Sequence, residues 1–187
     1  AINAAMNTLN KSEKYTKVAV GLHWLIALLI IGQLTLGLWM GTLPKEPPGL
    51  RSGWFNIHKS WGILIGALIF IRVLWRVTHR PPGLPESLAV WQRKLSHATH
   101  HLLYVLMVLV PLSGFLGSAY SKYPIKFFGQ ELPRCFDPDA SLKELFSNVH
   151  SVTTWTLIAL LVLHIAAALK HRFIDRDDIF QRMSFRR

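Results

Sequence analysis

The stretch VHSVTTWTLIALLVLHIAAALK, residues 149–170, decides how the chain folds. It is long enough and apolar enough to cross a lipid bilayer as one helix. His150 and His164 lie near its two ends, about 21 Å apart along a helix axis, and fourteen steps of about 100° bring both rings to nearly the same face. Imidazoles inside a hydrophobic span are costly to bury and are usually functional. The stretch therefore predicts two stacked sites, each of which takes a further ligand from another helix.

Composition favours an integral membrane protein of a single domain. The chain has 187 residues, 51% of them hydrophobic, and it contains seven Trp, a residue that prefers the membrane interface. The formal net charge of +11 fits loops at an anionic membrane surface and counter-charges for bound anionic groups. Because the apolar runs are so long, no nucleic-acid partner is expected.

Three more apolar stretches have the length of a membrane span. Together with the stretch quoted above they predict an all-α membrane protein, a bundle of four transmembrane helices. The first of them is expected to be a full span rather than a cleavable signal peptide. The four expected spans are residues 19–41, 54–77, 97–119 and 149–170.

The distribution of Lys and Arg predicts the orientation of the bundle. An even number of spans places both termini on one side of the membrane. That side carries 3 Lys or Arg before the first span, 5 around the second connection and 6 in the closing tail, against 7 on the other side. By the positive-inside rule, both termini are therefore expected in the cytoplasm.

This topology matches four histidines by depth. His23 and His164 both lie near the inner ends of their spans, and His58 and His150 both lie near the outer ends. Two such pairs predict two b-type haems, each with its iron between two imidazoles, which leaves no open coordination position and suits electron transfer. Zinc is a rival for any histidine pair, but neither depth offers a carboxylate or thiolate to complete a tetrahedral site. Hydrogen-bonded structural histidines are the other alternative.

Several further residues lie where haem carboxylates would need a partner. Arg72 and Arg76, one turn apart at the inner end of the second span, would pair with haem propionates or with lipid phosphates. Lys59 would serve the outer haem or attract an anionic substrate towards it. His100, at the start of the third span, would bind a propionate or a quinone head group, or would lie at the membrane interface.

Two glycines follow His58 at intervals of one helical turn. Gly62 and Gly66 leave a stripe without side chains beside this histidine. Such a stripe favours close packing of two helices, room for a flat macrocycle, or both.

Five short segments carry a resemblance to a known family. In this order they resemble the bacterial cytochrome b561 family, the four-helix di-haem b cytochromes of the inner membrane, over about residues 15–183. The run HRFIDRDD from His171 also resembles the end of that family. The segments are GLHWL around His23, NIHKSWGI around His58, RVLWR from Arg72, LSHATHHLLY around His97 and His100, and LVLHIAAALKH around His164.

The resemblance implies a place and an activity. In the family, one haem is held by the first and fourth helices and the other by the second and fourth, in agreement with the match by depth. It implies a multi-pass protein of the bacterial inner membrane that exchanges electrons with ubiquinone. One activity in the family is that of a superoxide:ubiquinone oxidoreductase, which passes an electron from periplasmic superoxide to ubiquinone.

Two other functions stay open at this point. The first is a cytochrome b subunit or relay for a periplasmic dehydrogenase or other redox partner. The second is a structural membrane module without haem. Membrane lipid and a second copy of the chain, in a homodimer, complete the expected partners.

Overall fold

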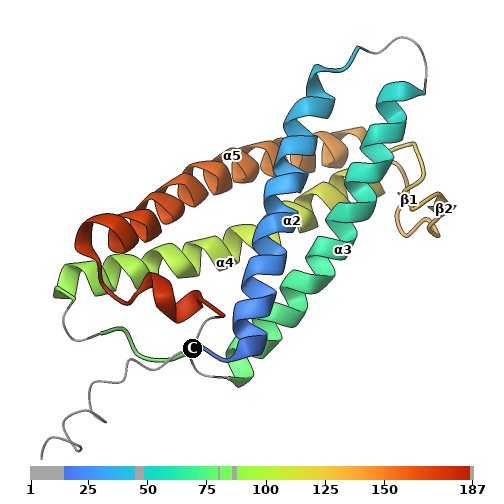
Figure 1. The fold of residues 1–187 in the computed structure, drawn as a ribbon. Helices are drawn as coiled ribbons and strands as arrows, with labels where there is room; N and C mark the ends of the chain where they lie inside the picture. Colours follow the sequence, from blue (N-terminus) through green and yellow to red (C-terminus); the bar gives the residue numbers. More distant parts are fainter. Residues whose placement is uncertain (1–14, 45–48, 80, 86–87, 186–187) are drawn as a thin grey trace, which may run out of the picture.

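Four long helices build the protein. The structure is a computed structural model that describes residues 15–44, 49–79, 81–85 and 88–185. Each of the four helices is long and apolar enough to cross a membrane. The fold is therefore the predicted all-α bundle of four membrane-spanning helices. The helices, labelled as in Figure 1, are α2 (Lys17–Thr42), α3 (Leu50–Thr78), α4 (Val90–Ala119) and α5 (Ala140–Lys170).

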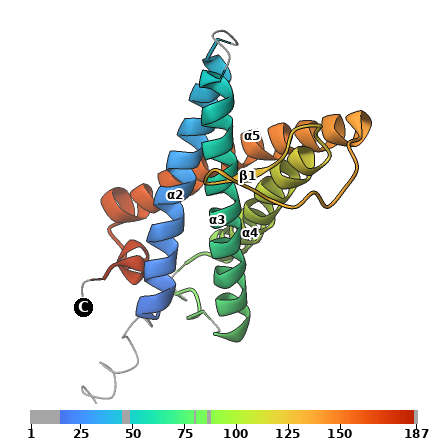
Figure 2. The same cartoon turned by 90° about the vertical axis from the view of Figure 1, so that its right-hand side faces the viewer.

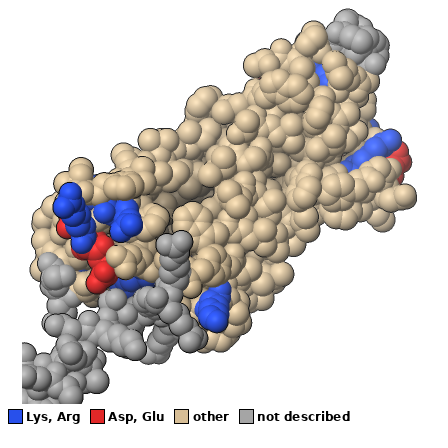
Figure 3. Space-filling model, in the orientation of Figure 1, with Lys and Arg blue, Asp and Glu red and all other residues tan. Residues whose placement is uncertain are grey.

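The helices contain the predicted spans and extend past them. α4 begins seven residues before residue 97 and α5 begins nine residues before residue 149, because polar first turns continue each helix beyond its apolar part. These starts are capped: the side chain of Gln92 accepts the N–H of Ala89, and that of Asp139 accepts the N–H of Leu142. On the face shown in Figure 3, charged side chains gather at the two ends of the molecule, and a broad uncharged band separates them.

The helices are arranged as two antiparallel pairs. α2 packs along α3, α4 packs along α5, and contacts between α3 and α4 join the two pairs, as Figures 1 and 2 show. We call the end that holds the start of α2 and the end of α5 the terminal end. The opposite end, which holds the end of α2 and the start of α5, is the hairpin end, because a short β-hairpin lies there.

An aliphatic core lies at mid-height in the bundle. All four helices contribute to it; on α3 its members fall between His58 and Arg72, and on α5 Leu157 falls between His150 and His164. This core separates the two ends of the molecule by a layer of close-packed apolar side chains. Its buried members are Ile26, Ile30, Ile65, Ile69, Leu103, Leu106 and Leu157.

The connection between α4 and α5 forms the β-hairpin. Strands β1 (Lys126–Phe127) and β2 (Gln130–Glu131) pair antiparallel, and β1 packs against α3. Figure 2 shows this connection crossing α3 at the hairpin end. These two strands have no signal in the sequence, because each has only two residues.

The C-terminal segment folds back against the terminal end. A π-helical turn (His171–Asp175) follows α5, and a 3-10 helix (Phe180–Met183) follows that turn. The indole N–H of Trp24 donates to the carbonyl of Met183 over 2.8 Å, and the guanidinium of buried Arg182 donates to the carbonyl of Gly83. The segment thus fastens α2 and the α3–α4 connection to the end of α5.

Candidate functional site

Four histidines face one another in two pairs inside the bundle. At the terminal end, the ring centroids of His23 (α2) and His164 (α5) lie 6.4 Å apart. At the hairpin end, the centroids of His58 (α3) and His150 (α5) also lie 6.4 Å apart. The two rings of each pair are nearly perpendicular, with interplanar angles of 71° and 83°. The structure thus brings together the residues that the sequence matched by depth.

The separation within each pair fits a metal ion between the rings. An N–H···N hydrogen bond would bring two imidazole centroids to about 5 Å. Iron–nitrogen bonds of about 2.0 Å on both sides, with about 1.1 Å from each nitrogen to its ring centre, give about 6.2 Å. The observed 6.4 Å matches the second geometry at both ends.

A large cavity surrounds the hairpin-end pair. Its volume is about 520 Å³, in the range of small-molecule and cofactor sites, and all four helices line it. His58 and His150 both line it, together with Lys59 from α3 and Lys143 from α5. Most of the other lining side chains are apolar, as the contact surface of a porphyrin requires.

Two glycines make room for the imidazoles of the hairpin-end pair. A Cβ atom on Gly114 of α4 would lie 3.0 Å from two atoms of the His150 ring, tighter than nine in ten real Cβ contacts. A Cβ atom on Gly37 of α2 would lie 3.1 Å from the His58 ring. Each ring therefore lies against the backbone of a helix that carries no ligand of this pair.

One ring of the hairpin-end pair is held in a defined tautomer. The Nδ1–H of His150 donates to the backbone carbonyl of Val110 in α4 over 2.8 Å. This bond leaves Nε2 without a proton and available for a metal, as in most histidine–metal sites. The Nδ1 of His58 is buried and has no hydrogen-bond partner among the described residues.

The terminal-end pair is surrounded by cations and a third histidine. The guanidiniums of Arg72 and Arg76 in α3 both lie over the ring of Tyr104 in α4, 5.7 and 5.9 Å from its centroid. Arg72 also comes within 3.3 Å of the Nδ1 of His23. At that length the contact is weak, so Arg72 stays available to pair with a carboxylate.

His100 also belongs to this cluster at the terminal end. Its ring centroid lies 5.4 Å from that of His164, and its Nδ1–H donates to the carbonyl of Ser96 over 2.6 Å. The predicted terminal-end residues therefore converge from all four helices. This arrangement can hold a dianionic cofactor beside a pair of imidazoles.

Comparison with known proteins gives the family. The profile of the prokaryotic cytochrome b561 family matches residues 14–186. The chain belongs to this family. It is 36% identical to cytochrome b561 homolog 2 of Escherichia coli (strain K12) over 95% of each chain. It is 28% identical to cytochrome b561 homolog 1 of the same organism, over 94% of this chain and 99% of that one.

A more distant relative carries an activity in its name. The chain is 25% identical to a probable superoxide oxidase, CybB, of Yersinia pestis, over 91% of this chain and 96% of that one. As a member of the cytochrome b561 family, the chain is a haem-binding membrane protein of electron transport. It is thus an oxidoreductase of the electron-transfer kind, with b-type haem as its cofactor.

Other candidates singled out in the sequence have structural places in this cytochrome. Gly62 packs against the Gln33 amide, whose N–H donates to the carbonyl of His58, and Gly66 packs against Pro111. The glycine stripe therefore serves close helix packing, and Gly62 also lines the cavity. His101, which follows His100 in the segment LSHATHHLLY, is exposed and donates from Nδ1 to the carbonyl of His97 within its own helix.

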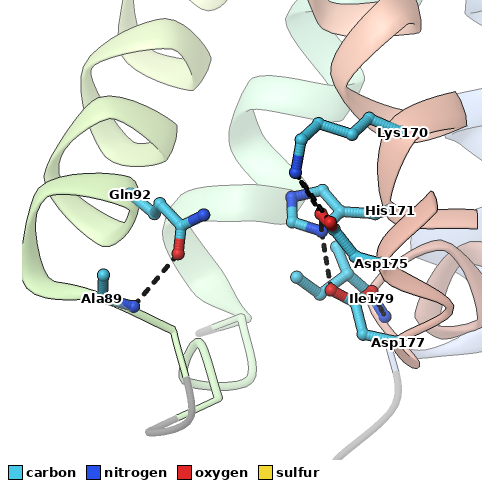
Figure 4. Close-up of polar contacts among 7 residues, drawn as sticks. All are labelled: Ala89, Gln92, Lys170, His171, Asp175, Asp177 and Ile179. Atoms are coloured by element: carbon cyan, nitrogen blue, oxygen red, sulfur yellow. Dashed lines mark hydrogen bonds and ion pairs between the residues drawn. The ribbon is translucent and has the colours of Figure 1, made fainter.

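The run HRFIDRDD forms an ion-pair cluster at the end of α5. His171 donates from Nδ1 to a carboxylate oxygen of Asp177 over 2.6 Å, and the ammonium of Lys170 pairs with Asp175 (Figure 4). The donor atoms of this histidine and these two aspartates lie within 4.8 Å of one another. Because Lys170 already supplies a cation there, the cluster stabilises the turn that redirects the chain.

Reasoning from the sequence missed three contributors to the hairpin-end pair. Gly37, Gly114 and the Val110 carbonyl contact the imidazoles across helix boundaries. A backbone carbonyl leaves no signal in a sequence, and a glycine in a membrane span is common without any ligand. Only the packing of α2 and α4 against α3 and α5 reveals them.

Proposed function

We propose that this cytochrome carries electrons across the bacterial inner membrane through two haems b. His23 and His164 would hold one haem, and His58 and His150 the other. The equal 6.4 Å separation of the rings in both pairs is the observation that supports this assignment. When bound, each haem iron supplies reversible one-electron oxidation and reduction. The two imidazoles of each pair would both hold the iron and leave no place for oxygen, which suits electron transfer.

The other residues of each site position and neutralise the haems. Arg72 and Arg76 balance the carboxylates at the terminal end, where bidentate pairing suits both partners. His100 would contact a haem carboxyl group or a quinone head group there through Nε2, which accepts a hydrogen bond because the Nδ1–H already donates to the Ser96 carbonyl. Lys59 supplies the positive charge beside the hairpin-end pair. Val110 holds the Nδ1–H of His150, so that its Nε2 keeps facing His58.

We further propose that the terminal end faces the cytoplasm and that the whole chain acts as one domain. The excess of Lys and Arg at the terminal end supports this orientation. Electrons then enter at the hairpin end, on the periplasmic side, and leave to ubiquinone in the bilayer. Ubiquinone takes up two electrons and two protons to become ubiquinol.

Superoxide is the donor that the hairpin end supports best. Each superoxide gives up one electron and leaves as O2, so two superoxide ions reduce one ubiquinone. Lys59 and Lys143 line the cavity at this end and attract a small anion. The similarity to a relative named as a probable superoxide oxidase adds support.

A relay for a periplasmic redox protein is the second candidate. Three aromatic side chains at the hairpin end, Tyr123, Phe128 and Phe136, are exposed. Exposed aromatic residues are common in the contact surfaces of protein partners. This function predicts a stable partner that co-purifies with the cytochrome.

The haem assignment is tested by counting haems. A pyridine haemochrome assay on the purified protein is expected to give two haems b per chain. Fewer than one haem per chain would refute the assignment. The matched variants His23→Ala and His58→Ala are each expected to lose one haem, and retention of both haems in either variant would refute its pairing.

The donor is tested by reducing the purified holoprotein with superoxide. Reduction, followed at the haem α-band, is expected to be close to diffusion-controlled and to slow as salt is added. Lys59→Gln and Lys143→Gln should weaken that salt dependence, while Lys94→Gln at the terminal end serves as the control. Slow reduction without salt dependence would exclude superoxide and favour the protein relay.

A further inference from the structure

The hydroxyl of Ser60 joins the ligand helix to the β-hairpin. Ser60 is almost fully buried (1% exposed) and lies in α3, two residues after His58. Its Oγ accepts the backbone N–H of Phe128 over 2.9 Å. The same oxygen lies 2.8 Å from the carbonyl of Asn56 and 3.1 Å from that of Lys126, either of which takes its proton. One buried side chain thus bridges segments almost seventy residues apart.

The hairpin adopts a conformation that its own sequence does not favour. The two residues between β1 and β2, Phe128 and Gly129, have φ of 47° and 92°, as in a type I′ turn. Glycine adopts such values readily, whereas a bulky residue such as Phe128 rarely does. A backbone of this kind persists only where its surroundings hold it in place, and it often marks a functional region.

Contacts with α3 supply that support. The ring of Phe128 meets the ring of Trp61 edge-on, with centroids 5.8 Å apart. The N–H of Leu132 donates to the carbonyl of Ile125, which closes the base of the hairpin. Among these contacts, only the Ser60 hydroxyl reaches the strained turn from the buried side.

The base of the hairpin borders the cavity at the hairpin end. Ile125, at the base of the hairpin, lines the same cavity as His58, Lys59 and His150. We propose that the segment 125–131 is a roof over the hairpin-end haem and that Ser60 is the positioning residue that holds it closed. The roof then controls how easily water-soluble reductants reach that haem. This inference rests on the proposed haem at His58 and His150.

Removing the Ser60 hydroxyl should open the roof. In Ser60→Ala, the N–H of Phe128 loses its buried partner, and a strained turn loses its attachment to α3. Unsatisfied buried groups of this kind are costly enough to raise the open population about tenfold. In the holoprotein, trypsin cleavage after Lys126 should then accelerate about tenfold relative to cleavage after Lys122, which precedes the roof.

A second readout follows the haem itself. In Ser60→Ala, the phase of dithionite reduction that belongs to the hairpin-end haem should accelerate, while the terminal-end phase should not. Ser60→Thr, which keeps a hydroxyl, should restore slow cleavage. Ser52→Ala is the matched control, because Ser52 lies in the same helix and, among the described residues, its hydroxyl bonds to the carbonyl of Gly49 at the start of that helix. Equal acceleration of both haem phases, or cleavage at the wild-type rate, would overturn the proposal.

Gly129→Ala tests the roof without touching the core. A Cβ at Gly129 would meet no atom within 4 Å, so only the positive φ opposes the substitution. This variant should open the roof in the same way as Ser60→Ala does. It therefore tests the proposal even where Ser60→Ala fails to fold. Gly53→Ala, also in open space but without a positive φ, is its control. The cleavage assay does not depend on the electron donor, so it remains decisive if the proposed function fails.

Discussion

Substitution of Gly114 by alanine tests the hairpin-end site most directly. The new Cβ would lie 3.0 Å from both Cε1 and Nδ1 of His150, whereas ordinary contacts begin near 3.4 Å. The ring must therefore retreat by a few tenths of an ångström, about 0.4 Å for an ordinary contact, which is twice the tolerance of about 0.2 Å on a metal–ligand bond. The retreat also strains the 2.8 Å hydrogen bond from Nδ1 to the Val110 carbonyl.

The expected result is selective loss of one haem. Disturbing the outer support of a ligand histidine commonly lowers affinity for the bound group by about 10- to 100-fold. The pyridine haemochrome assay should show the haem content of Gly114→Ala falling from two towards one per chain. Low-temperature absorption spectra should show that the remaining α-band is the one that His58→Ala also retains.

Two other glycines serve as controls for this substitution. A Cβ at Gly66 would meet Pro111 at an ordinary 3.4 Å, and a Cβ at Gly32 would meet nothing within 4 Å. Both alanine variants should keep two haems and wild-type spectra. Two haems with unchanged spectra in Gly114→Ala would refute the reasoning, because the ring would then have no fixed place against α4.

Three further predictions concern other parts of the chain. Gly37→Ala should disturb the same haem as Gly114→Ala but less strongly, because its Cβ would come as close as 3.1 Å to only one atom of the His58 ring. Haem counting on the two variants shows which of them loses more haem. Arg72→Gln should lower the midpoint potential of the terminal-end haem, since a nearby cation favours the reduced form; a redox titration measures it. Trp24→Phe removes the hydrogen bond to Met183, worth about 1 kcal/mol, and should speed trypsin cleavage after Arg182 about fivefold in a mass-resolved digest.

The sequence was enough to predict the helices and the histidine pairs. Hydrophobic length identified the four spans, and the fourteen-residue spacing of His150 and His164 placed both on one face. The structure confirms the four-helix bundle, and it sets both pairs at a separation suited to haem iron. Ligation of the haems itself stays a prediction.

The sequence could not predict how the sites are closed. In the sequence, Ser60 cannot be distinguished from any other polar residue of a membrane span, and its partner Phe128 lies far away along the chain. The acceptor for His150 is a backbone carbonyl, which every residue has. Such contacts depend on the rotation of each helix about its axis, and the apolar pattern of a membrane span constrains that rotation weakly.

The two proposed haem sites differ in a way that would set the direction of electron flow. At the hairpin end, the Nδ1–H of His150 donates to a carbonyl, which makes the ligand more electron-rich and favours oxidised iron. At the terminal end, Arg72 approaches the ring of His23 and Arg76 lies over Tyr104, which favours the reduced form. Lys59 and Lys143 act in the same sense at the hairpin end, so the difference on which the prediction rests is the hydrogen bond of His150. We therefore expect the terminal-end haem to have the higher midpoint potential, so that electrons run downhill from the hairpin end. Redox titrations of His23→Ala and His58→Ala, each of which should keep one haem, assign the two midpoint potentials. A higher potential at the hairpin-end haem would contradict the prediction.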